Sequence, residues 1–529
     1  MSTYTISEQL QGFPVFQMVV LGFLRIGEPI AFTSMFPYIY FMIKSFNIAE
    51  NEADISRYSG YLASAFSFCQ FLSTVHWARA SNRFGRKTIL LCGVAGTAIA
   101  MIVFGMSTNF YMALFARSLM GLLNGNVSIM RTTVGEIAHQ KRHQALAFSN
   151  LSLIWSLGKC VGGWLGGVLT NTKDIVDNMG AVGSKSDQFF RAHPFAFSNF
   201  VVASILFTFI IVAWLFLEET HEDLKDSRDI GLEVGDAIRK RLGFDVPERP
   251  WKTNQYDSES ADPLLDEETE ESITVLELHA YSTKGRTGEE DEDHSSEESS
   301  TEEVEKTGIP TPVLNCIFNN FMCSFQNLIY VEFLPVLLAK RLMLDDLKFP
   351  LHIKGGFGFT SASIGTFISF TGLIGVFLST FLFPVITKYC SPVIGYRIGL
   401  SLYPFIYFLL PLYIFTLHDY NPNIPGFVTS SLLYFNGSVI SFINGMTFTQ
   451  ILMLIHGASP PKQRALINSY AMSITALARC AAPILWGWLI SKCDAAGYGG
   501  ISWWLLSLWA FIAFSQSFRL KETQEDELT

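Results

Sequence analysis

An arginine and a glutamate, Arg25 and Glu28, lie three residues apart in the middle of the first long apolar run of the chain. The run extends from about Pro14 to Ile43, and these are its only two charged residues. A span of about 20 apolar residues crosses a bilayer, so the run is long enough to do so with tilt or a kink. An ionised side chain at the centre of such a helix costs about 2.5–3.5 kcal/mol on insertion scales, and charges kept there mark substrate or proton paths. The pair therefore predicts a transport path.

The spacing of this pair indicates the chemistry that it can perform. Residues three apart lie on one helix face, about 4.5 Å apart along the axis. Glu28 can bind a proton or a cation, while Arg25 favours the ionised carboxylate until access to the site changes. The alternative is a fixed ion pair that orients this helix against its neighbours.

Four further charged residues fall inside apolar runs. Arg117 can hold a substrate carboxylate or pair with Glu28 or Glu332, and its alternative role is packing. Lys159 and Arg479 are equivalent positions of an internal repeat, so we expect them to face each other. Two cations there suggest an anionic substrate or two salt bridges to the glutamates, unless both side chains reach to the membrane surface. Glu332 is a second coupling candidate, unless it lies near the non-cytosolic end.

Polar residues of the same runs are candidates for lining the path. Buried amides form hydrogen bonds between helices just as often, so both roles stay open. The candidates are Tyr38, Gln70, Asn124, Asn126, Asn444 and Gln450.

Twelve apolar segments must position these residues. They fall at about 14–43, 58–77, 88–107, 110–132, 146–170, 195–217, 311–339, 359–387, 393–418, 428–452, 465–491 and 500–517. The predicted division is a cytosolic tail (1–13), a six-helix bundle (14–217), an acidic cytosolic loop (218–310), a second six-helix bundle (311–517) and a cytosolic tail (518–529).

The composition supports a membrane protein. The chain of 529 residues is 49% hydrophobic and 16% charged, whereas soluble domains are roughly 25% charged. Residues 218–310 hold 29 of the 47 acids and 10 of the 37 bases, a net charge of −19. The rest holds 18 acids and 27 bases, a net charge of +9. An acidic soluble insert thus joins two weakly basic membrane halves, and nucleic acid is not an expected partner.

Sequence motifs for catalysis are missing from the chain. No CxxC or HExxH motif occurs, which gives a metal site no local support, and no GxxxxGK[ST] loop occurs, which argues against an ATP-driven pump. We expect no enzyme activity, no metal and no cofactor.

The acidic insert is predicted to be a mostly disordered linker. It is rich in Ser, Glu, Asp and Thr and cannot bury enough apolar surface to fold as a whole. Residues 230–242 are the exception, since they can form an amphipathic helix along the membrane surface. Serines in acidic runs are accessible to acid-directed kinases, and residues 262–265 resemble a dileucine sorting signal. The serines are Ser258, Ser260, Ser295 and Ser296.

An internal repeat relates the two halves. A shift of 320 residues aligns Leu123–Gly167 with Ile443–Gly487 without a gap, and eleven of the 45 positions are identical. In this alignment Lys159-Cys160 falls on Arg479-Cys480. Parallel halves of this kind are what major-facilitator transporters show, with the binding site near the midplane between them.

The loop after the second segment resembles the major-facilitator signature G-x-L-a-D-r-x-G-r-k. Asn82 stands at its acidic position and Ala78 at its first glycine. We expect Glu136 to replace the missing carboxylate by pairing with Arg83 or Arg86, as an electrostatic latch of the inward-closed state. The predicted cytosolic gate motif is Asn82, Arg83, Gly85, Arg86, Lys87 and Glu136.

Other segments narrow the resemblance. Arg117 with Gly121 and Gly125 resembles the span-4 motif, and Gly158–Gly163 resembles the G-P-x-x-G-G of proton antiporters with Lys159 in place of proline. Residues 25–38 and 476–483 resemble spans 1 and 11 of fungal transporters near the zinc-induced-facilitator-like and drug:proton antiporter groups.

The resemblance implies an all-α, twelve-span major-facilitator fold. Such a protein moves a small solute by alternating access, and proton coupling is expected with Glu28 as the first candidate. The alternative is a non-transporting nutrient sensor or scaffold whose acidic loop recruits a partner. The expected setting is a monomer in the vacuolar or plasma membrane. Both termini are predicted to be cytosolic because basic residues crowd the loop 79–87, which has no acid.

Overall fold

The computed structural model describes residues 11–138, 140–170, 185–244, 246, 249, 251, 310–460 and 464–520. The predicted kinase sites and the dileucine-like segment lie outside the described residues. Contacts divide the chain into two compact units, one from residues 1–222 and 311–529 and the other from 223–310.

The large unit is built from helices that coincide with all twelve predicted segments. The first half contains α2 (Val15–Thr33), α3 (Ile39–Ser45), α4 (Ile55–Phe84), α5 (Arg86–Gly105), α6 (Phe110–Leu123), α7 (Asn126–Ile137), α8 (Lys141–Val168), α10 (Lys185–Ala192) and α11 (Ala196–Phe216). The second half contains α16 (Thr311–Ala339), α17 (Ser361–Tyr389), α18 (Pro392–Leu409), η3 (Leu410–Thr416), α19 (Gly426–Ala458), α20 (Arg464–Ala495) and α21 (Gly500–Ser517). In the described part of the chain, eight helices are long and apolar enough to cross a membrane.

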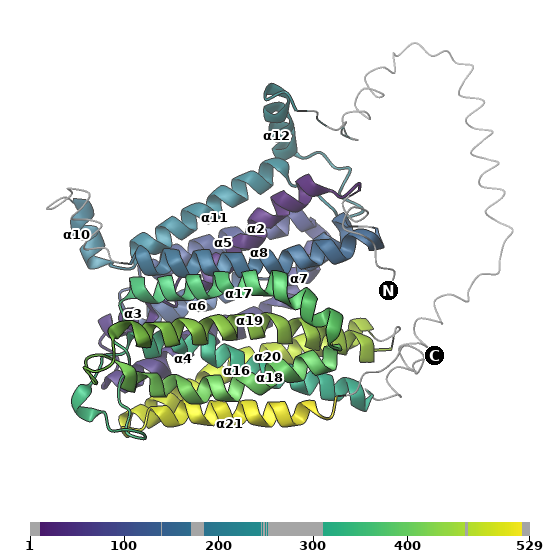
Figure 1. Cartoon of the computed structure of the whole chain (residues 1–529). Helices are drawn as coiled ribbons and strands as arrows, with labels where there is room; N and C mark the ends of the chain where they lie inside the picture. Colours follow the sequence, from purple (N-terminus) through teal and green to yellow (C-terminus); the bar gives the residue numbers. More distant parts are fainter. Residues whose placement is uncertain are drawn as a thin grey trace, which may run out of the picture. The chain divides into compact units, whose positions relative to one another are not determined.

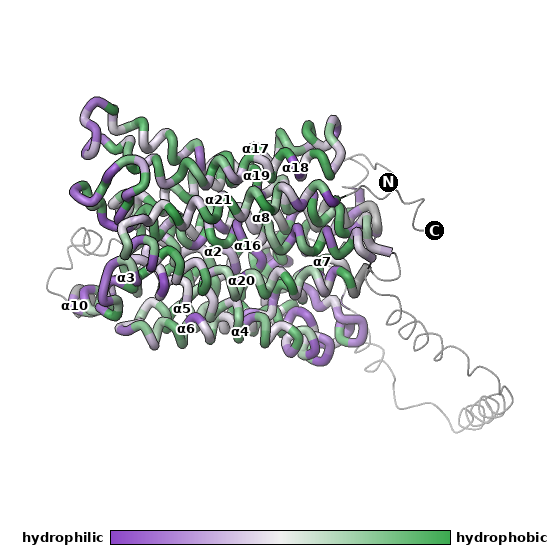
Figure 2. The backbone as a smooth tube through the Cα atoms, turned by 90° about the horizontal axis from the view of Figure 1, so that it is seen from below, coloured by the Kyte–Doolittle hydropathy of each residue, from purple (hydrophilic) through white to green (hydrophobic). Residues whose placement is uncertain are grey.

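The helices run side by side with apolar residues along their lengths, and hydrophilic residues gather toward their ends (Figure 2). Such an arrangement suits a bilayer, because helices satisfy their own backbone hydrogen bonds in hydrocarbon. The all-helical membrane fold predicted from the sequence is therefore observed.

Two of the predicted segments are broken within the bundle. The first divides into α2 and α3 at residues 34–38, and the fourth divides into α6 and α7 at Asn124-Gly125. Asn124 has φ −103° and ψ 79°, outside the helical region. Asparagine and glycine both have low helix propensity, which explains a break at this point.

The two halves pack through two helix pairs, α4 with α20 and α8 with α17 (Figure 1). At Gly60 of α4 an added Cβ would lie 2.2 Å from the Pro483 oxygen of α20, so this contact requires glycine. The Ser64 hydroxyl donates to the Cys480 carbonyl at 2.9 Å, also between α4 and α20. These contacts lie in the first third of α4 and the second half of α20, and we call this end of the unit the closed end.

Glycines also bring α8 onto its neighbours. Cβ atoms added at Gly158, Gly162 and Gly166 would approach atoms of residues 26–34 within 2.6 Å, so this face of α8 lies against α2 and the turn after it. A Cβ at Gly167 would lie 2.6 Å from the Ser361 oxygen of α17. Small residues at a spacing of four allow such close helix contact in membranes.

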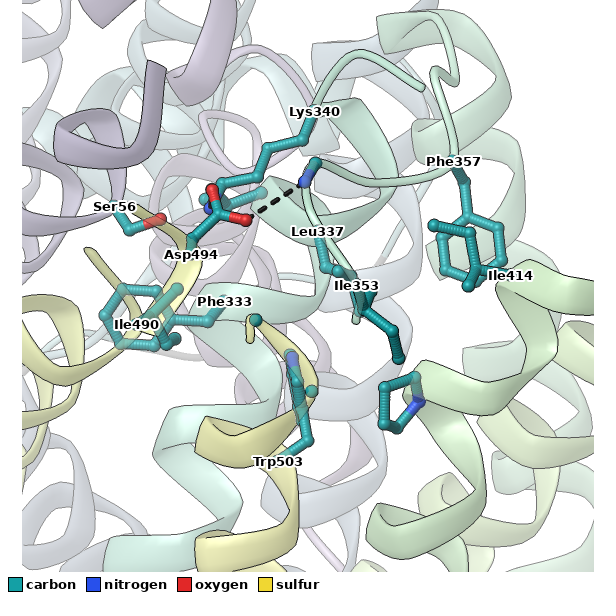
Figure 3. Close-up of a pocket in the computed structure, with 15 residues that line it drawn as sticks. Ser56, Phe333, Leu337, Lys340, Ile353, Phe357, Ile414, Ile490, Asp494 and Trp503 are labelled. Carbon is teal, nitrogen blue, oxygen red and sulfur yellow. Dashed lines mark hydrogen bonds and ion pairs between the residues drawn. The ribbon is translucent and has the colours of Figure 1, made fainter. Parts of the chain in front are cut away.

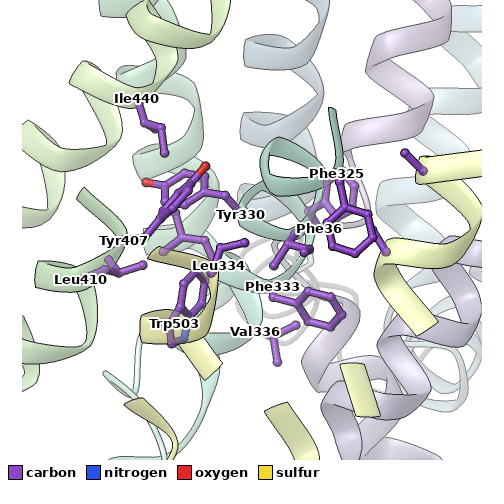
Figure 4. Packing of buried hydrophobic residues seen from close by; sticks show 14 of the residues in the cluster. Phe36, Phe325, Tyr330, Phe333, Leu334, Val336, Tyr407, Leu410, Ile440 and Trp503 are labelled. Carbon is purple, nitrogen blue, oxygen red and sulfur yellow. The ribbon is translucent and has the colours of Figure 1, made fainter. Parts of the chain in front are cut away.

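The largest buried cluster of aromatic and aliphatic side chains is centred on α16. Phe333 and Tyr330 of α16 pack with Tyr407 of α18 and Trp503 of α21, and Phe36 of the first half joins the same cluster (Figure 4). This cluster therefore connects the two halves near the closed end.

The second unit contains the predicted amphipathic helix as α12 (Ile230–Arg241). The Asp229 carboxylate accepts a hydrogen bond from the Leu232 amide at 3.1 Å and caps the helix. Asp236 accepts two hydrogen bonds from the Arg249 guanidinium, at 2.8 and 2.9 Å. Ile230, the first residue of the helix, is 65% exposed, and the predicted location of α12 along the membrane surface stays a prediction.

Candidate functional site

The Arg25–Glu28 pair forms a direct contact in the middle of α2. Arg25 Nη1 donates to Glu28 Oε2 at 2.7 Å, and the two side chains are 13% and 9% exposed. Pro29 has no amide hydrogen, so the Arg25 carbonyl loses its helical partner next to this pair. The Arg25 guanidinium lies 4.6 Å from the centre of the Trp155 ring of α8. The pair is thus positioned by both its own helix and α8.

Two more arginines and an amide surround Glu28. The Asn124 side chain, at the α6–α7 break, lies near the Glu28 carboxyl group. Arg131 of α7 and Arg479 of α20 are within electrostatic range of the same carboxyl group. We call Arg25, Glu28, Arg131 and Arg479 the cationic cluster. It includes residues of both halves.

Arg131 was not predicted from the sequence. It lies one residue before the predicted end of the fourth segment, where an arginine is ordinarily taken to reach the membrane surface. In the structure its guanidinium contacts the Met472 sulfur of α20 at 3.6 Å, and its side chain remains exposed. A contact with the opposite half directs Arg131 to the space between the halves. The sequence feature that could have indicated this position is the Asn124-Gly125 pair, where the helix breaks before Arg131.

Arg117 lies with Glu332 and not with Glu28. Both are buried, at 1% and 4% exposure, and their charges act on each other between α6 and α16. Among the described residues, Arg117 Nη2 and Glu332 Oε2 have no hydrogen-bond partner. The Arg117 guanidinium also lies 4.7 Å from the Phe66 ring. Of the two predicted partners of Arg117, the structure favours Glu332.

Lys159 and Arg479 have different surroundings. The electrostatic neighbour of Lys159 is Cys160, whereas Arg479 lies near Glu28 and Arg131. In the described part of the chain Lys159 forms no ion pair. Its carbonyl accepts a hydrogen bond from Thr33 at 3.1 Å, which joins α8 to α2.

The predicted lining residues of the first half make contacts between helices. The Tyr38 hydroxyl bonds to the Asn199 side chain of α11 at 2.9–3.1 Å and is fully buried. The Gln70 amide donates to the Asn124 carbonyl at 3.3 Å. Asn126 is 4% exposed and packs against Gly93 of α5.

The two lining candidates of the second half behave in the same way. Asn444 accepts a hydrogen bond from the Tyr403 hydroxyl at 2.6 Å. Gln450 is 1% exposed, and its amide packs on Gly395 of α18. Asn124 is therefore the lining candidate that lies beside the cationic cluster.

The predicted motif loop connects α4 to α5. Gly85 has φ 90°, a conformation that favours glycine over other residues. Arg86 contacts Glu136 of α7 at 3.1 Å and donates to Asn82 Oδ1 at 2.6 Å. The predicted ion pair of Glu136 therefore forms with Arg86, while the Arg83 guanidinium lies 5.4 Å from the Phe84 ring.

A carboxylate three residues after the end of α11 completes this loop. Glu219 accepts hydrogen bonds from the backbone amides of Arg86 and Lys87 at 2.8 and 3.1 Å. A negative charge at a helix N-terminus is favourable, so Glu219 stabilises the start of α5. The Lys87 ammonium donates to the Trp214 carbonyl at 2.8 Å. All of these contacts lie within the first half.

A second buried ion pair lies at the closed end of the second half. Lys340, directly after α16, donates to Asp494 Oδ2 of α20 at 2.8 Å, and Asp494 Oδ1 accepts from the Gly355 amide at 3.0 Å. Both residues line a small pocket with Phe333 and Trp503 (Figure 3). The pair links α16, α20 and the loop before α17, and sequence analysis did not identify it. Among the described residues, no group of three or more metal-ligating side chains occurs.

Helices in two halves, with an ion pair at mid-depth and charged residues of both halves around it, define a membrane transport protein. The chain belongs to the major facilitator superfamily, because the model of that family matches residues 21–483. The chain is therefore a member of a transporter family and not an enzyme.

Relatives in fungi and plants agree with this assignment. The chain is 30% identical over 526 residues to the major facilitator superfamily multidrug transporter mfsB of Aspergillus fumigatus, covering 97% of this chain and 84% of the relative. It is 24% identical to the protein ZINC INDUCED FACILITATOR 1 of Arabidopsis thaliana, covering 92% and 87%. A bacterial homologue of the human lysosomal transporter Spinster, solved in an inward-facing conformation, shares the fold with a TM-score of 0.62 at 11% identity, covering 96% of each chain.

Proposed function

We propose that the chain is a proton-coupled secondary transporter that moves a small solute by alternating access, with Glu28 as the coupling residue. The observation that carries the proposal is the position of Glu28, which lies in contact with Arg25 of its own helix and near Arg479 of the opposite half. The similarity to a transporter described as a multidrug transporter supports small organic solutes as cargo.

The coupling follows from the charges around Glu28. While it is ionised, Glu28 attracts both Arg25 and Arg479, so it draws the two halves together at this level. Protonation removes that attraction and frees Arg25 for another partner. A change in the proton state thus alters the contact between the halves, which is the change that alternating access requires.

Uptake into proteoliposomes across an imposed pH gradient tests this proposal. The solute panel contains organic anions, organic cations, amino acids and zinc, and Glu28→Gln is compared with wild type. Glu50→Gln is the matched control, because it removes an exposed carboxylate outside the spanning helices. We expect gradient-driven uptake in wild type and Glu50→Gln and its loss in Glu28→Gln.

Two other results would redirect the assignment. Uptake that ignores the pH gradient in all three proteins would indicate a facilitator, with Arg25–Glu28 as a structural pair. No uptake of any solute would support the alternative function, a nutrient sensor or scaffold that acts through the acidic loop.

The remaining features of the proposal concern the setting. We propose a monomer in the vacuolar or plasma membrane, with both termini cytosolic, bundles at 14–217 and 311–517, and kinase or sorting contacts on the acidic loop. In this orientation the closed end faces away from the cytosol. The contact of Arg86 with Glu136 then lies on the cytosolic side, within the first half, and does not itself join the two halves.

A further inference from the structure

The cationic cluster has an excess of positive charge. Arg25 contacts Glu28, and Arg131 and Arg479 are within electrostatic range of it, so three cations accompany one anion and the formal charge is +2. Arg25 and Arg131 act on each other, as do Arg131 and Arg479. Like charges held together in a low-dielectric region are costly unless an anion compensates them.

The protein does not complete the hydrogen bonding of this cluster. Among the described residues, Arg25 Nε and Asn124 Oδ1 are buried without a hydrogen-bond partner. Arg131 touches the Met472 sulfur, which is a weak acceptor, and its side chain is exposed. Donors of two guanidinium groups thus lack a strong acceptor among the described residues.

The break between α6 and α7 adds to the positive potential. Helix α7 has 12 residues and begins at Asn126, two residues after Asn124, which approaches Glu28. No side chain caps its first turn. Helix N-termini carry a partial positive charge, and broken helices in transporters direct such ends at anionic groups.

We propose that the cationic cluster binds a small organic anion, a carboxylate or a phosphate ester, held by Arg25 and Arg131 of one half and Arg479 of the other. This inference rests on the proposed transport function and gives its substrate class. Because the three arginines belong to both halves, the bound anion connects the halves. Arginine suits this role because its planar donors match carboxylate and phosphate groups in pairs.

The same charges determine how protons and the anion affect each other. Protonation of Glu28 raises the cluster charge from +2 to +3, so an anion binds more tightly to the protonated protein. The charged groups within electrostatic range of Glu28 are Arg25 on its own helix, Arg131 on α7 and Arg479 on α20. All of them are cations, so none reverses the sign. Proton and anion therefore bind together, which is the relation that symport needs.

Thermal unfolding of the purified full-length protein tests this site without a gradient. The probes are succinate, inorganic phosphate and tetraethylammonium, each titrated at constant ionic strength because screening alone changes charge interactions. We expect succinate, phosphate or both to raise the unfolding temperature, more so at acidic than at neutral pH, and tetraethylammonium to have no such effect. The separate anion titrations identify whether a carboxylate or a phosphate is the better ligand.

Variants locate the effect. Arg131→Gln and Arg479→Gln each should weaken the apparent affinity for the anion about tenfold or more, as expected for a lost charge-assisted hydrogen bond. Lys388→Gln is the matched control, since it removes an exposed cation from the far end of α17. Arg479→Lys keeps the charge and should retain part of the affinity.

Two results would overturn the inference. The first is that tetraethylammonium stabilises the wild-type protein and neither anion does. This test uses only the wild-type protein, so it does not depend on the folding of any variant. The other is an anion effect that stays unchanged in Arg131→Gln and Arg479→Gln. The proposed transport function fails separately: anion binding without flux in vesicles would refute transport but keep the site, and proton-driven flux of a cation would refute the site but keep transport.

Discussion

Gly60→Ala should open the closed end. The added Cβ would lie 2.2 Å from the Pro483 oxygen and 3.0 Å from its carbonyl carbon, and both are backbone atoms that cannot rotate away. Relief of the clash requires α4 and α20 to separate by about 1 Å, given ordinary van der Waals separations. The same movement lengthens the Ser64–Cys480 hydrogen bond of 2.9 Å.

The expected magnitude follows from the cost of overpacking. An extra methyl group in a tight contact costs about 1–3 kcal/mol. Since the contact exists only while the closed end is shut, that cost shifts the conformational equilibrium by about 5–150-fold away from this state.

Hydrogen exchange measured by mass spectrometry detects this shift. Peptides from residues 55–66 and 480–491 should exchange faster in Gly60→Ala than in wild type. Gly457→Ala of α19 is the matched control, because a Cβ there meets nothing within 4 Å. Equal exchange in the two variants would refute the assignment of Gly60 to a contact that closes this end.

Three further predictions concern the ion pairs and the contact between the halves. Glu136→Gln removes the ion pair with Arg86 of α5 and should change the rate of transport while solute binding persists. Separate binding and flux assays measure the two effects, and loss of solute binding would contradict this prediction. Lys340→Met leaves the buried Asp494 carboxylate without its cation and should lower the free energy of unfolding by about 3–5 kcal/mol. The double variant Lys340→Met with Asp494→Leu should recover most of this loss. Thermal unfolding in detergent measures both variants, and an unchanged stability of Lys340→Met would refute the prediction. Ser64→Ala removes one hydrogen bond between the halves, a loss of about 1 kcal/mol, and should speed exchange at the closed end less than Gly60→Ala does; an equal or larger effect would be inconsistent with the geometry.

The fold was predictable because membrane helices are governed by one strong constraint. Long apolar runs such as residues 196–216 and 361–389 can only be helices in hydrocarbon, so segment positions follow from composition. The break at Asn124-Gly125 was not predicted, since the apolar pattern continues through it. The low helix propensity of Asn124 and Gly125 interrupts the helix in the structure, but the hydrophobic pattern of the sequence does not show this interruption.

The candidate site was predictable only in part. The Arg25–Glu28 pair was predictable because the two residues are only three positions apart on one helix. The Glu136 ion pair was predictable because the motif loop offers few basic residues as partners. Arg131 was missed because it lies at the edge of an apolar segment, and its partner Met472 is 341 residues away along the chain. Lys159 and Arg479 occupy equivalent positions of the internal repeat, but their neighbours in the structure differ, because each helix packs against different helices.

Proton flux driven by solute shows whether Glu28 couples protons to transport. Vesicles that contain the protein and a pH-sensitive dye start without a pH gradient, and a transported solute is added outside. Coupling through Glu28 predicts a change of internal pH in wild type and in Glu50→Gln but none in Glu28→Gln, even where the variant still exchanges solute. Equal proton movement in wild type and Glu28→Gln would show that Glu28 is not the coupling residue.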